Sequence, residues 1–402
     1  MDGIGRSAGI DWAKERHAVC IIDGQGSAIS RFEVEHTDAG LRELVRRLTG
    51  VAGVAIERPD GPVIDALLEA DIPVVVIASR HVKALRTRYG LAGNKDDRSD
   101  AFILADALRT DGQRLRPLHP DTPETVALRA LVRARKDLVQ ARVRLVQQLT
   151  AHLELVFPGA VDLFDDLASP IARAFLLRFP SVERAAWLSP KRMAAWLAAQ
   201  GYCGRSTGAQ LHARLEAASR GMVGDAAGTM AAVTLALVHA IEAIREQTGT
   251  LEGRIAEQLL AHPDGRIFTS LPRAGRVRAA ALLAEIGDCR ERFPTPESLA
   301  CLAGASPSTR QSGQHRAVTF RFACDKKLRD ALIDFAGDSR FGNDWAADIY
   351  GRARARGKRH PHAVRILARA WIYVIWRCWQ DGVPYDPGRH QALQRVLLAP
   401  AA

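Results

Sequence analysis

The chain has 402 residues, a length that suggests two or three domains. Hydrophobic residues make up 47% and charged residues 25%, which excludes global disorder. No apolar run reaches the roughly 18–20 residues of a membrane span; the nearest, Ala226–Val238, is short. Because the N-terminal residues also lack the apolar stretch of a signal peptide, we expect a cytoplasmic protein without a membrane partner.

Six cysteines are scattered along the chain and form no CxxC motif. This spacing argues against a disulfide framework or a zinc ribbon, and we expect free thiols.

The positive charge is concentrated in one part of the chain. The formal net charge is +11, and residues 1–120, 121–265 and 266–402 carry −1, +1 and +11 respectively. Of the 56 basic residues 48 are arginine, a bias that a GC-rich genome also produces, so the arginine content alone decides nothing. The concentration of charge in the last third favours a polyanionic partner.

The first 120 residues alternate predicted strands and helices. The predicted strands are Ser7–Ala13, His17–Ile22, Ala28–Glu35, Val51–Ile56 and Pro73–Ile77, and the predicted helices are Gly40–Leu48, Pro62–Glu69, a helix beginning near His81, and Asp97–Leu108. The turn signal Asp23–Gly26 makes the first three strands an antiparallel meander. Three hairpin strands followed by α/β crossovers predict an RNase H-like (RuvC-like) α/β domain over residues 1–120.

The rest of the chain is predicted to be mostly helical. Prolines 117, 120 and 123 mark a linker, and an apolar stripe of nearly 3.5-residue period predicts a long helix from about Glu124 to Val156. Short helices over 160–220 and a second long helix to about Leu260 complete a predicted coiled-coil arm, residues 121–262, with an ordinary helical bundle as the alternative. A basic, mostly α-helical domain is predicted over 263–402.

Four carboxylates stand out in the first domain. Asp11 interrupts an apolar strand, where a carboxylate is costly unless it is paired or metal-bound. Glu57 ends the apolar run of the fourth strand, and Asp97 and Asp100 share one face at the start of a helix. Together they would suit two Mg²⁺ ions that clamp a phosphodiester. Asp96 and Asp106 are close competitors, and capping of the helix is an alternative role for Asp97 and Asp100.

The last third offers a polar segment and a basic run. Residues 302–316 read as a loop with several hydroxyl groups, and spacing alone assigns no nucleophile among them. The turn 271–275 precedes a helix and offers backbone N–H groups to a phosphate. For the basic side chains we favour nucleic-acid binding over a solvated face: Arg352, Arg354, Arg356, Lys358, Arg359, Arg365 and Arg369. The aromatic residues Trp371, Tyr373, Trp376 and Trp379 follow, and we expect most of them in the core.

Several blocks resemble one family. Gly9–Lys14, Glu57–Gly61 and Asn94–Ala101 are similar to blocks of the DEDD transposases of bacterial insertion sequences, the IS-one-ten family. Leu271–Asp288 resembles the family's helix-hairpin-helix segment, and Leu302–Gly313 resembles its serine-containing block. The blocks occur in the family's order and cover nearly the whole chain.

The resemblance implies a RuvC-like nuclease domain, a coiled-coil insertion and a C-terminal transposase domain. It also implies DNA recombination guided by a structured bridge RNA that pairs with donor and target DNA, in a homo-oligomer (dimer or tetramer) whose composite active sites take carboxylates and serine from different subunits. By this resemblance the DEDD set is Asp11, Glu57, Asp97 and Asp100, and the nucleophile is Ser312.

Three further assignments accompany this serine. Arg310 and Arg316 are expected to neutralise charge on the attacked phosphate, and His315 is a candidate proton shuttle. Arg273 stands where the family usually has the first glycine of Pro-Gly-x-Gly, so its charge would replace a backbone contact to phosphate. Ser306 and Ser308 are the nearest alternatives to Ser312.

Two other functions remain open from the sequence. A RuvC-like hydrolase of branched DNA would use metal-activated water and no serine. A non-catalytic coiled-coil protein that binds nucleic acid would tolerate the loss of all four carboxylates, and the intact DEDD set argues against it.

Overall fold

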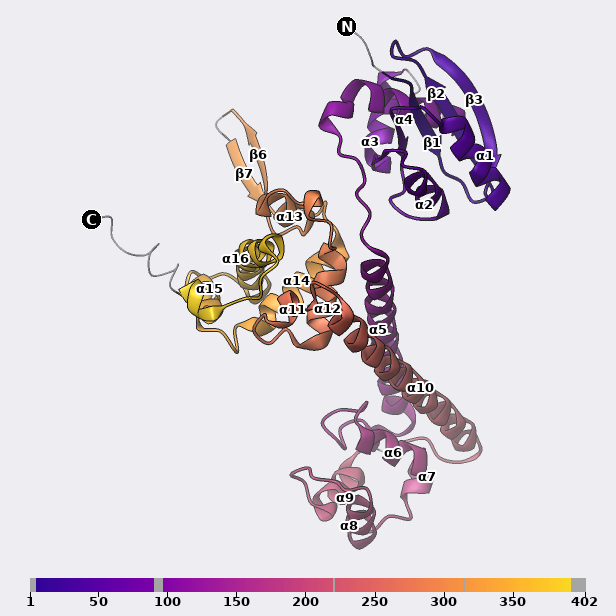
Figure 1. Ribbon diagram of the computed structural model, residues 1–402. Helices are drawn as coiled ribbons and strands as arrows, with labels where there is room; N and C mark the ends of the chain where they lie inside the picture. The colour runs from indigo at the N-terminus through magenta and orange to yellow at the C-terminus, as the bar shows by residue number, and fades with distance from the viewer. Residues whose placement is uncertain (1–4, 90–96, 220, 314, 392–402) are drawn as a thin grey trace, which may run out of the picture. The chain divides into compact units, whose positions relative to one another are not determined.

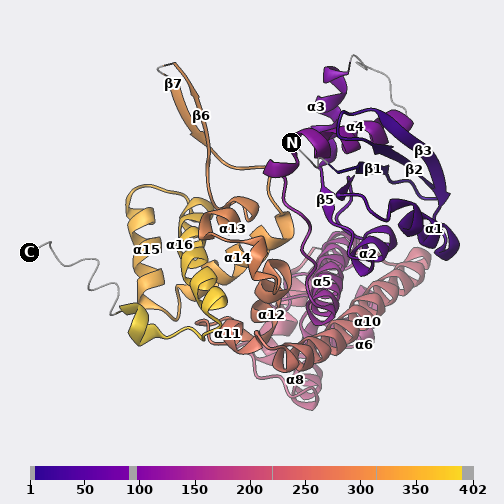
Figure 2. The ribbon, with the colours of Figure 1, turned by 45° about the horizontal axis from the view of Figure 1, so that its top comes forward.

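The computed structural model describes residues 5–89, 97–219, 221–313 and 315–391, without the side chains of Asp225, His315 and Arg316. The chain forms two compact units, Met1–Pro120 and Asp121–Ala402. Figures 1 and 2 show the elements of each unit. The further boundary that we expect near residue 262 stays a prediction.

The first unit is built on a five-stranded mixed sheet. Its strands are β1 (Ser7–Asp11), β2 (Arg16–Ile22), β3 (Ala28–Glu35), β4 (Gly53–Ile56) and β5 (Val74–Val76). The order in the sheet is β3-β2-β1-β4-β5, with β1 antiparallel to β2 and parallel to β4. Strands β2 and β3 are antiparallel, and β4 and β5 are parallel. An antiparallel meander joined to parallel crossover strands is the predicted RNase H-like arrangement, which the strand order therefore confirms.

Helices cover both faces of this sheet. They are α1 (Asp38–Leu48), α2 (Pro62–Glu69), α3 (Ser79–Arg88) and α4 (Asp97–Asp111), followed by the short 3₁₀ turn Gly112–Arg114. Leu44 of α1 and Leu67 of α2 are fully buried in one core with Ile10 and Ile56. On the other face, α3 and α4 bury Val82 and Leu104 against Ala55. The alternation of side chains along a strand explains this division, because Ala55 and Ile56 point to opposite faces.

A glycine lets α4 lie directly on the central strand. A Cβ atom added at Gly9 of β1 would lie 2.5 Å from the backbone nitrogen of Ala105 and closer still to the carbonyl oxygen of Ala101. No real Cβ fits at such distances, so residue 9 must be glycine for α4 to pack here. This contact fixes the start of α4 near the end of β1.

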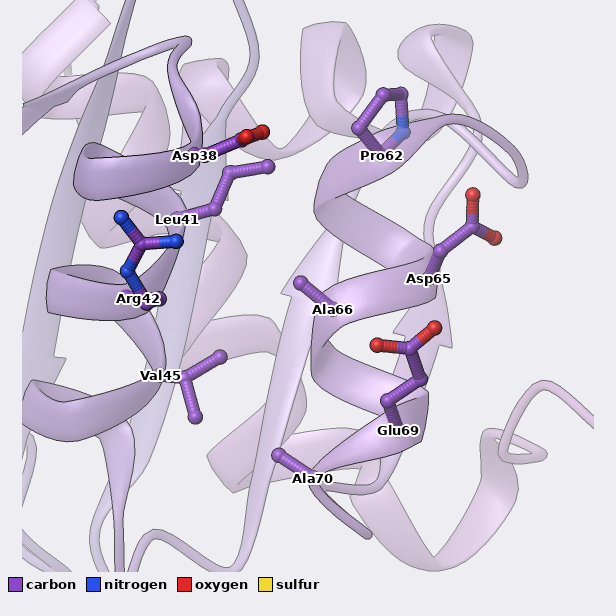
Figure 3. A pocket seen from close by; sticks show the side chains of 9 residues that line it. All are labelled: Asp38, Leu41, Arg42, Val45, Pro62, Asp65, Ala66, Glu69 and Ala70. Atoms are coloured by element: carbon purple, nitrogen blue, oxygen red, sulfur yellow. The ribbon is translucent and has the colours of Figure 1, made fainter.

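A groove of about 510 Å³ runs between α1 and α2 on the other face (Figure 3). Asp38, Asp65 and Glu69 lie along it with Arg42. Because it opens beside Leu41 and Val45 of α1, it lies on the face of the sheet away from α4.

The second unit begins with two long helices. Its helices are α5 (Pro123–Val156), α6 (Pro170–Arg178), α7 (Val182–Ala185), α8 (Pro190–Ala199), α9 (Gly208–Ala217), α10 (Asp225–Ala261), α11 (Gly265–Thr269), α12 (Gly275–Ile286), α13 (Pro296–Leu302), α14 (Lys326–Ser339), α15 (Asp344–Ala355) and α16 (His360–Asp381), with 3₁₀ turns at Pro158–Ala160 and Arg290–Arg292. Helices α5 and α10 are antiparallel, since Thr125 bonds His262 while His152 bonds Thr234. The predicted pair of long helices around short ones is present, and its coiled-coil character stays a prediction.

Helix α10 contributes to two hydrophobic cores. Ile241 is buried with the short helices α6–α9, whereas Ile255 and Leu259 are buried with the C-terminal helices. By length and composition alone, the segment Ala226–Ala261 is also long and apolar enough to cross a membrane. It also carries the ion-paired Glu242 and Glu252, and 28% of its most apolar window is buried.

The C-terminal helices pack around a core that contains the expected tryptophans. Trp371 and Trp379 of α16 are fully buried, and Trp376 is partly buried with its indole N–H donated to the Phe293 carbonyl. Tyr373 differs, because it is 38% exposed and donates its hydroxyl to Glu297.

The predicted polar loop at 302–316 is instead the end of α13 and a β-hairpin. Strands β6 (Ser308–Ser312) and β7 (His315–Thr319) pair antiparallel and project from the helices in both views (Figures 1 and 2). The expectation of a loop was wrong because polar residues occupy both faces of β6, which removes the apolar alternation that marks a half-buried strand.

Candidate active site

Two carboxylates leave the sheet side by side. Ile10 and Ile56 are partners in the parallel register of β1 and β4, so Asp11 and Glu57 each come one residue later on adjacent strands. Such strands lie about 4.8 Å apart. Ile10 and Ile56 face α1 and α2, and the following residues therefore point to the face covered by α3 and α4. The sequence predicted this pair, and the register places both residues at the carboxyl ends of the parallel strands β1 and β4.

Helix α4 brings a third carboxylate to the same face. Asp100 comes one residue before Ala101, whose carbonyl packs against Gly9 of β1. Its side chain is only 3% exposed, and its two oxygens accept hydrogen bonds from one arginine of α3. Arg86 Nε lies 2.7 Å from Oδ1, and Nη2 bonds Oδ2. Burying a carboxylate this deeply is costly unless the carboxylate is paired, and Arg86 provides the partner.

Arg86 is the common neighbour of three acidic side chains. Its pKa is raised, first by the hydrogen bonds to Asp100 and, against the opposing effect of desolvation, by attraction to Asp100, Glu57 and Asp11. Ser79, at the start of the same helix, donates its hydroxyl to Glu57 Oε2 at 2.7 Å. Sequence reasoning missed both residues of α3, since neither lies in a recognisable motif.

The remaining acidic candidates separate into different environments. Asp97 is exposed at the first residue of α4, one turn before Asp100. Asp96 lies outside the described residues. Asp106 is buried two turns further on, where it accepts hydrogen bonds from the Tyr89 hydroxyl and from Arg109 Nε at 2.8 Å. Burial, and then the bond to Asp106, raise the pKa of Tyr89 to about 12. Asp106 therefore has its own partners, Tyr89 and Arg109, and does not bond to Arg86.

The donor set suits a hard divalent cation. Asp11, Glu57, Asp97 and Asp100 offer only carboxylate oxygens, the ligands that Mg²⁺ prefers. Within the described ranges, no three His, Cys, Asp or Glu side chains already form a metal-binding group. Arg86 supplies the positive charge that faces the carboxylates in this structure.

The loops that follow β1 and β4 contact each other. The Arg58 guanidinium lies 4.3 Å from the centre of the Trp12 ring, so the residues after Glu57 and Asp11 are linked. His17 is completely buried behind this loop, accepts the Ala13 N–H at its Nδ1 and lies 2.9 Å from His36. Burial, and then the charge of His36, lower the pKa of His17 to about 4. A neutral His17 thus supports the backbone beside Asp11.

The predicted nucleophile lies at the tip of the hairpin. Ser312 is exposed as the last residue of β6 and pairs with His315 of β7. The next residue, Gly313, has a φ of +55°, a left-handed conformation that favours glycine. The side chains of His315 and Arg316 lie outside the described part of the chain, whereas Arg310 is exposed two residues before Ser312.

The two alternative serines lie at the base of the hairpin. Ser306 is buried, and its carbonyl accepts a hydrogen bond from Arg321. The carbonyl of Ser308 accepts the Thr319 hydroxyl. Ser308 is half-buried, whereas Ser312 at the other end of β6 is exposed.

The predicted basic residues differ in the groups that their side chains contact. Arg273 has a φ of +56°, and its guanidinium pairs with Asp338 at 3.1 Å, so a carboxylate already compensates its charge. Arg352 pairs with Asp348 at 2.8 Å. Arg354 and Arg356 donate to the backbone carbonyls of Lys358 and Arg352, and Lys358 and Arg359 are exposed beside them between α15 and α16.

Comparisons with known proteins agree with this arrangement of motifs. A family model of DEDD transposases of the IS110 type, described as "Transposase", matches residues 8–158, and the model "Transposase IS116/IS110/IS902 family" matches residues 265–351. The "Mini-circle putative transposase for IS117" of Streptomyces coelicolor is 30% identical over 399 residues, 95% of each chain. The chain belongs to the IS110 family of transposases.

The chain is also similar to a further insertion-element protein and to one solved structure. The "Insertion element IS110 uncharacterized 43.6 kDa protein" of S. coelicolor is 28% identical over 96% of each chain. The structure "T. thermophilus RuvC in complex with Holliday junction substrate" is 17% identical and covers 28% of this chain and 99% of RuvC, with a TM-score of 0.22. The fold assignment rests on the strand order instead. Membership in the family implies an enzyme that cleaves and rejoins DNA, and its DEDD carboxylates imply dependence on a divalent metal.

Proposed function

We propose that this transposase is an RNA-guided, Mg²⁺-dependent DNA recombinase that works through a covalent phosphoserine at Ser312. Asp11, Glu57, Asp97 and Asp100 would hold two Mg²⁺ ions. The observation that supports this most is the register of β1 and β4, which sets Asp11 beside Glu57 on the face where Asp100 is buried.

The chain's own residues would perform the exchange of phosphodiester bonds. The Ser312 oxygen forms a bond to phosphorus, the bond from phosphorus to a deoxyribose oxygen breaks, and the serine proton is balanced by a proton on that leaving oxygen. A second deoxyribose hydroxyl then reverses the step and joins a new strand, so no ATP is consumed. Bound Mg²⁺ would polarise the phosphodiester and stabilise the leaving oxygen.

The exposure of Ser312 agrees with this role. A nucleophile at the tip of a projecting hairpin is accessible to a DNA backbone, and Gly313 lets the chain reverse directly behind it. Arg310 on the same strand, and Arg316 on the facing one, would contribute positive charge near the attacked phosphate. The serine and the carboxylates would come from different subunits of a dimer or tetramer.

The proposal of a guide RNA rests on the family membership and on the charge of the last third of the chain. The net +11 of residues 266–402 favours a polyanion, which DNA and RNA both satisfy. Donor and target DNA would be selected by pairing with a structured RNA encoded beside the gene. The assay described next therefore includes an RNA transcribed from the DNA that flanks the gene.

A denaturing gel tests the covalent step. Purified protein is incubated with labelled DNA, the transcribed RNA and Mg²⁺, and we expect a protein–DNA adduct that requires all three. Ser312→Ala should abolish the adduct. Ser308→Ala is the matched control, because it makes the same substitution at the other end of β6. This variant should still form the adduct.

Two results would contradict the proposal. An adduct in Ser312→Ala would move the nucleophile to another residue. DNA cleavage by the wild type without any adduct would favour a hydrolase that uses water.

A further inference from the structure

A basic pocket of about 350 Å³ lies at the base of the β6–β7 hairpin. We call it the hairpin-base pocket. Its walls include Val318, Phe320, Arg321, His362, Arg365 and Arg369. They come from β7, the segment after it and the first half of α16. Arg365 and Arg369 belong to the basic run that we expect to bind nucleic acid, whereas Phe320 and Arg321 have no part in the candidate active site.

The charge of this pocket is uncompensated. Among its described lining residues none is acidic. Arg321 donates to the backbone carbonyls of Ser306 and Pro307, which hold its guanidinium in place without neutralising it. Desolvation and the charges of Arg365 and Lys358 lower the pKa of His362, so this ring is neutral near pH 7. Three arginines thus create a positive pocket that suits an anion.

Two aromatic rings lie at the pocket: Phe320 lines it, and Phe322 lies beside it in contact with Phe320. The Arg365 guanidinium lies 4.8 Å from the centre of the Phe320 ring, which Arg329 also approaches at 5.8 Å. Phe322 meets Phe320 edge to face, with 4.8 Å between ring centres, and is 78% exposed. Because most of the Phe322 ring is exposed, it offers a stacking surface for a base.

We propose that the hairpin-base pocket binds an unpaired nucleotide of the DNA strand, with its phosphate on Arg321, Arg365 and Arg369 and its base stacked on Phe322. Positive grooves with aromatic platforms are typical of sites for single-stranded nucleic acid, because every base has a face that stacks. Paired bases are already stacked within a duplex and cannot use Phe322 in this way. The pocket therefore selects unpaired strands.

The position of the pocket favours DNA as the ligand. Thr319 lines the pocket and pairs with Ser308, whereas Ser312 is four residues further along β6. At about 3.4 Å per residue, the two sites on the hairpin are roughly 14 Å apart. A DNA strand held at the base would thus lie on the same hairpin as the proposed nucleophile. The inference rests on the proposed function only in taking DNA as the polymer that this hairpin contacts.

Fluorescence anisotropy of the full-length protein tests the pocket. The probes are a labelled oligothymidylate, its duplex with oligodeoxyadenylate, and an oligouridylate of equal length. Phe322→Ala should weaken binding of the single DNA strand by roughly 5- to 100-fold and leave the duplex unaffected. Arg369→Gln should lower the slope of log affinity against log salt for the single strand by about 0.7, the effect of one phosphate contact.

Matched controls lie elsewhere in the same unit. Phe341 is another exposed phenylalanine, 66% exposed, and Arg205 is an exposed arginine between α8 and α9. Phe341→Ala and Arg205→Gln should leave binding of the single DNA strand unchanged.

Three results with the Phe322→Ala variant would overturn the inference. The first is an unchanged affinity of this variant for the single DNA strand, and the second is an equal loss of affinity for the duplex. The third is a larger loss of affinity for oligouridylate than for oligothymidylate, which would assign the pocket to RNA. A wild type that binds no single DNA strand would overturn it equally. The covalent chemistry is tested separately, because loss of the Ser312 adduct does not alter these equilibrium affinities.

Discussion

The pairing of Arg86 with Asp100 gives a quantitative prediction for the metal-free protein. Replacing Arg86 with methionine keeps much of the side-chain volume and leaves the Asp100 carboxylate buried without its partner. Breaking a fully buried ion pair costs about 3–5 kcal/mol. Because the Arg86 side chain is 22% exposed, solvent screens part of the charge, and we expect about 2–4 kcal/mol. That loss of free energy corresponds to a fall of roughly 30- to 1,000-fold in the protection of the α4 amides against hydrogen exchange.

Hydrogen exchange read by mass spectrometry in EDTA measures this loss directly in peptides from α4. The matched control is Arg80→Met, at an exposed position on the same helix α3, which should leave the exchange unchanged. The double variant Arg86→Met with Asp100→Asn removes the unpaired charge, and it should recover most of the protection. If Arg86→Met costs as much protection in the Asp100→Asn background as in the wild-type background, the two side chains are not coupled and the assignment of Arg86 fails.

Three further predictions concern the first unit. Gly9→Ala should destabilise the packing of α4 on β1 by at least about 3 kcal/mol, because the new methyl would meet the backbone of Ala101 and Ala105; thermal unfolding indistinguishable from wild type would refute this close approach. His17 has a pKa of about 4 when folded and about 6.5 when unfolded, so the unfolded state takes up the proton first. Stability should therefore fall by about 3 kcal/mol as the pH drops from 6.5 to 4. His17→Phe should remove that part of the pH dependence in urea unfolding, and an identical pH profile in the variant would count against it. Asp11→Ala should abolish strand exchange and leave RNA affinity intact, and full exchange by this variant, or by the wild type in EDTA, would exclude a metal site at Asp11.

The carboxylates on the strands could be located from the sequence because the strands around them are simple. Glu57 was predicted at the end of an apolar run and directly follows β4, whereas Asp11 was predicted within a strand and is the last residue of β1. The strand order follows from the meander and crossovers. Equal register then sets them side by side. Asp100 was assigned from its motif, but its burial and its bond to Arg86 depend on how α3 and α4 pack. No local pattern of residues encodes that contact.

The C-terminal site was harder to predict, because its residues depend on partners distant in sequence. Arg273 stands in a predicted phosphate-binding turn, and only the fold shows that it pairs with Asp338, 65 residues later. The hairpin was missed because polar β6 lacks alternation, although the turn at Gly313 is a signal for it. The hairpin-base pocket combines residues from β7 and α16, which the sequence separates by about forty positions.

The most direct test of the central claim is to locate the covalent bond. Cleavage by trypsin after Arg310 and Arg316 releases a peptide, residues 311–316, in which Ser312 is the only hydroxyl-bearing side chain. Protein that has reacted with DNA, transcribed RNA and Mg²⁺ is digested with nuclease and trypsin and analysed by tandem mass spectrometry. We expect a nucleotide remnant on this peptide at Ser312. A remnant on any other peptide, or cleaved DNA with no remnant on the protein, would contradict it.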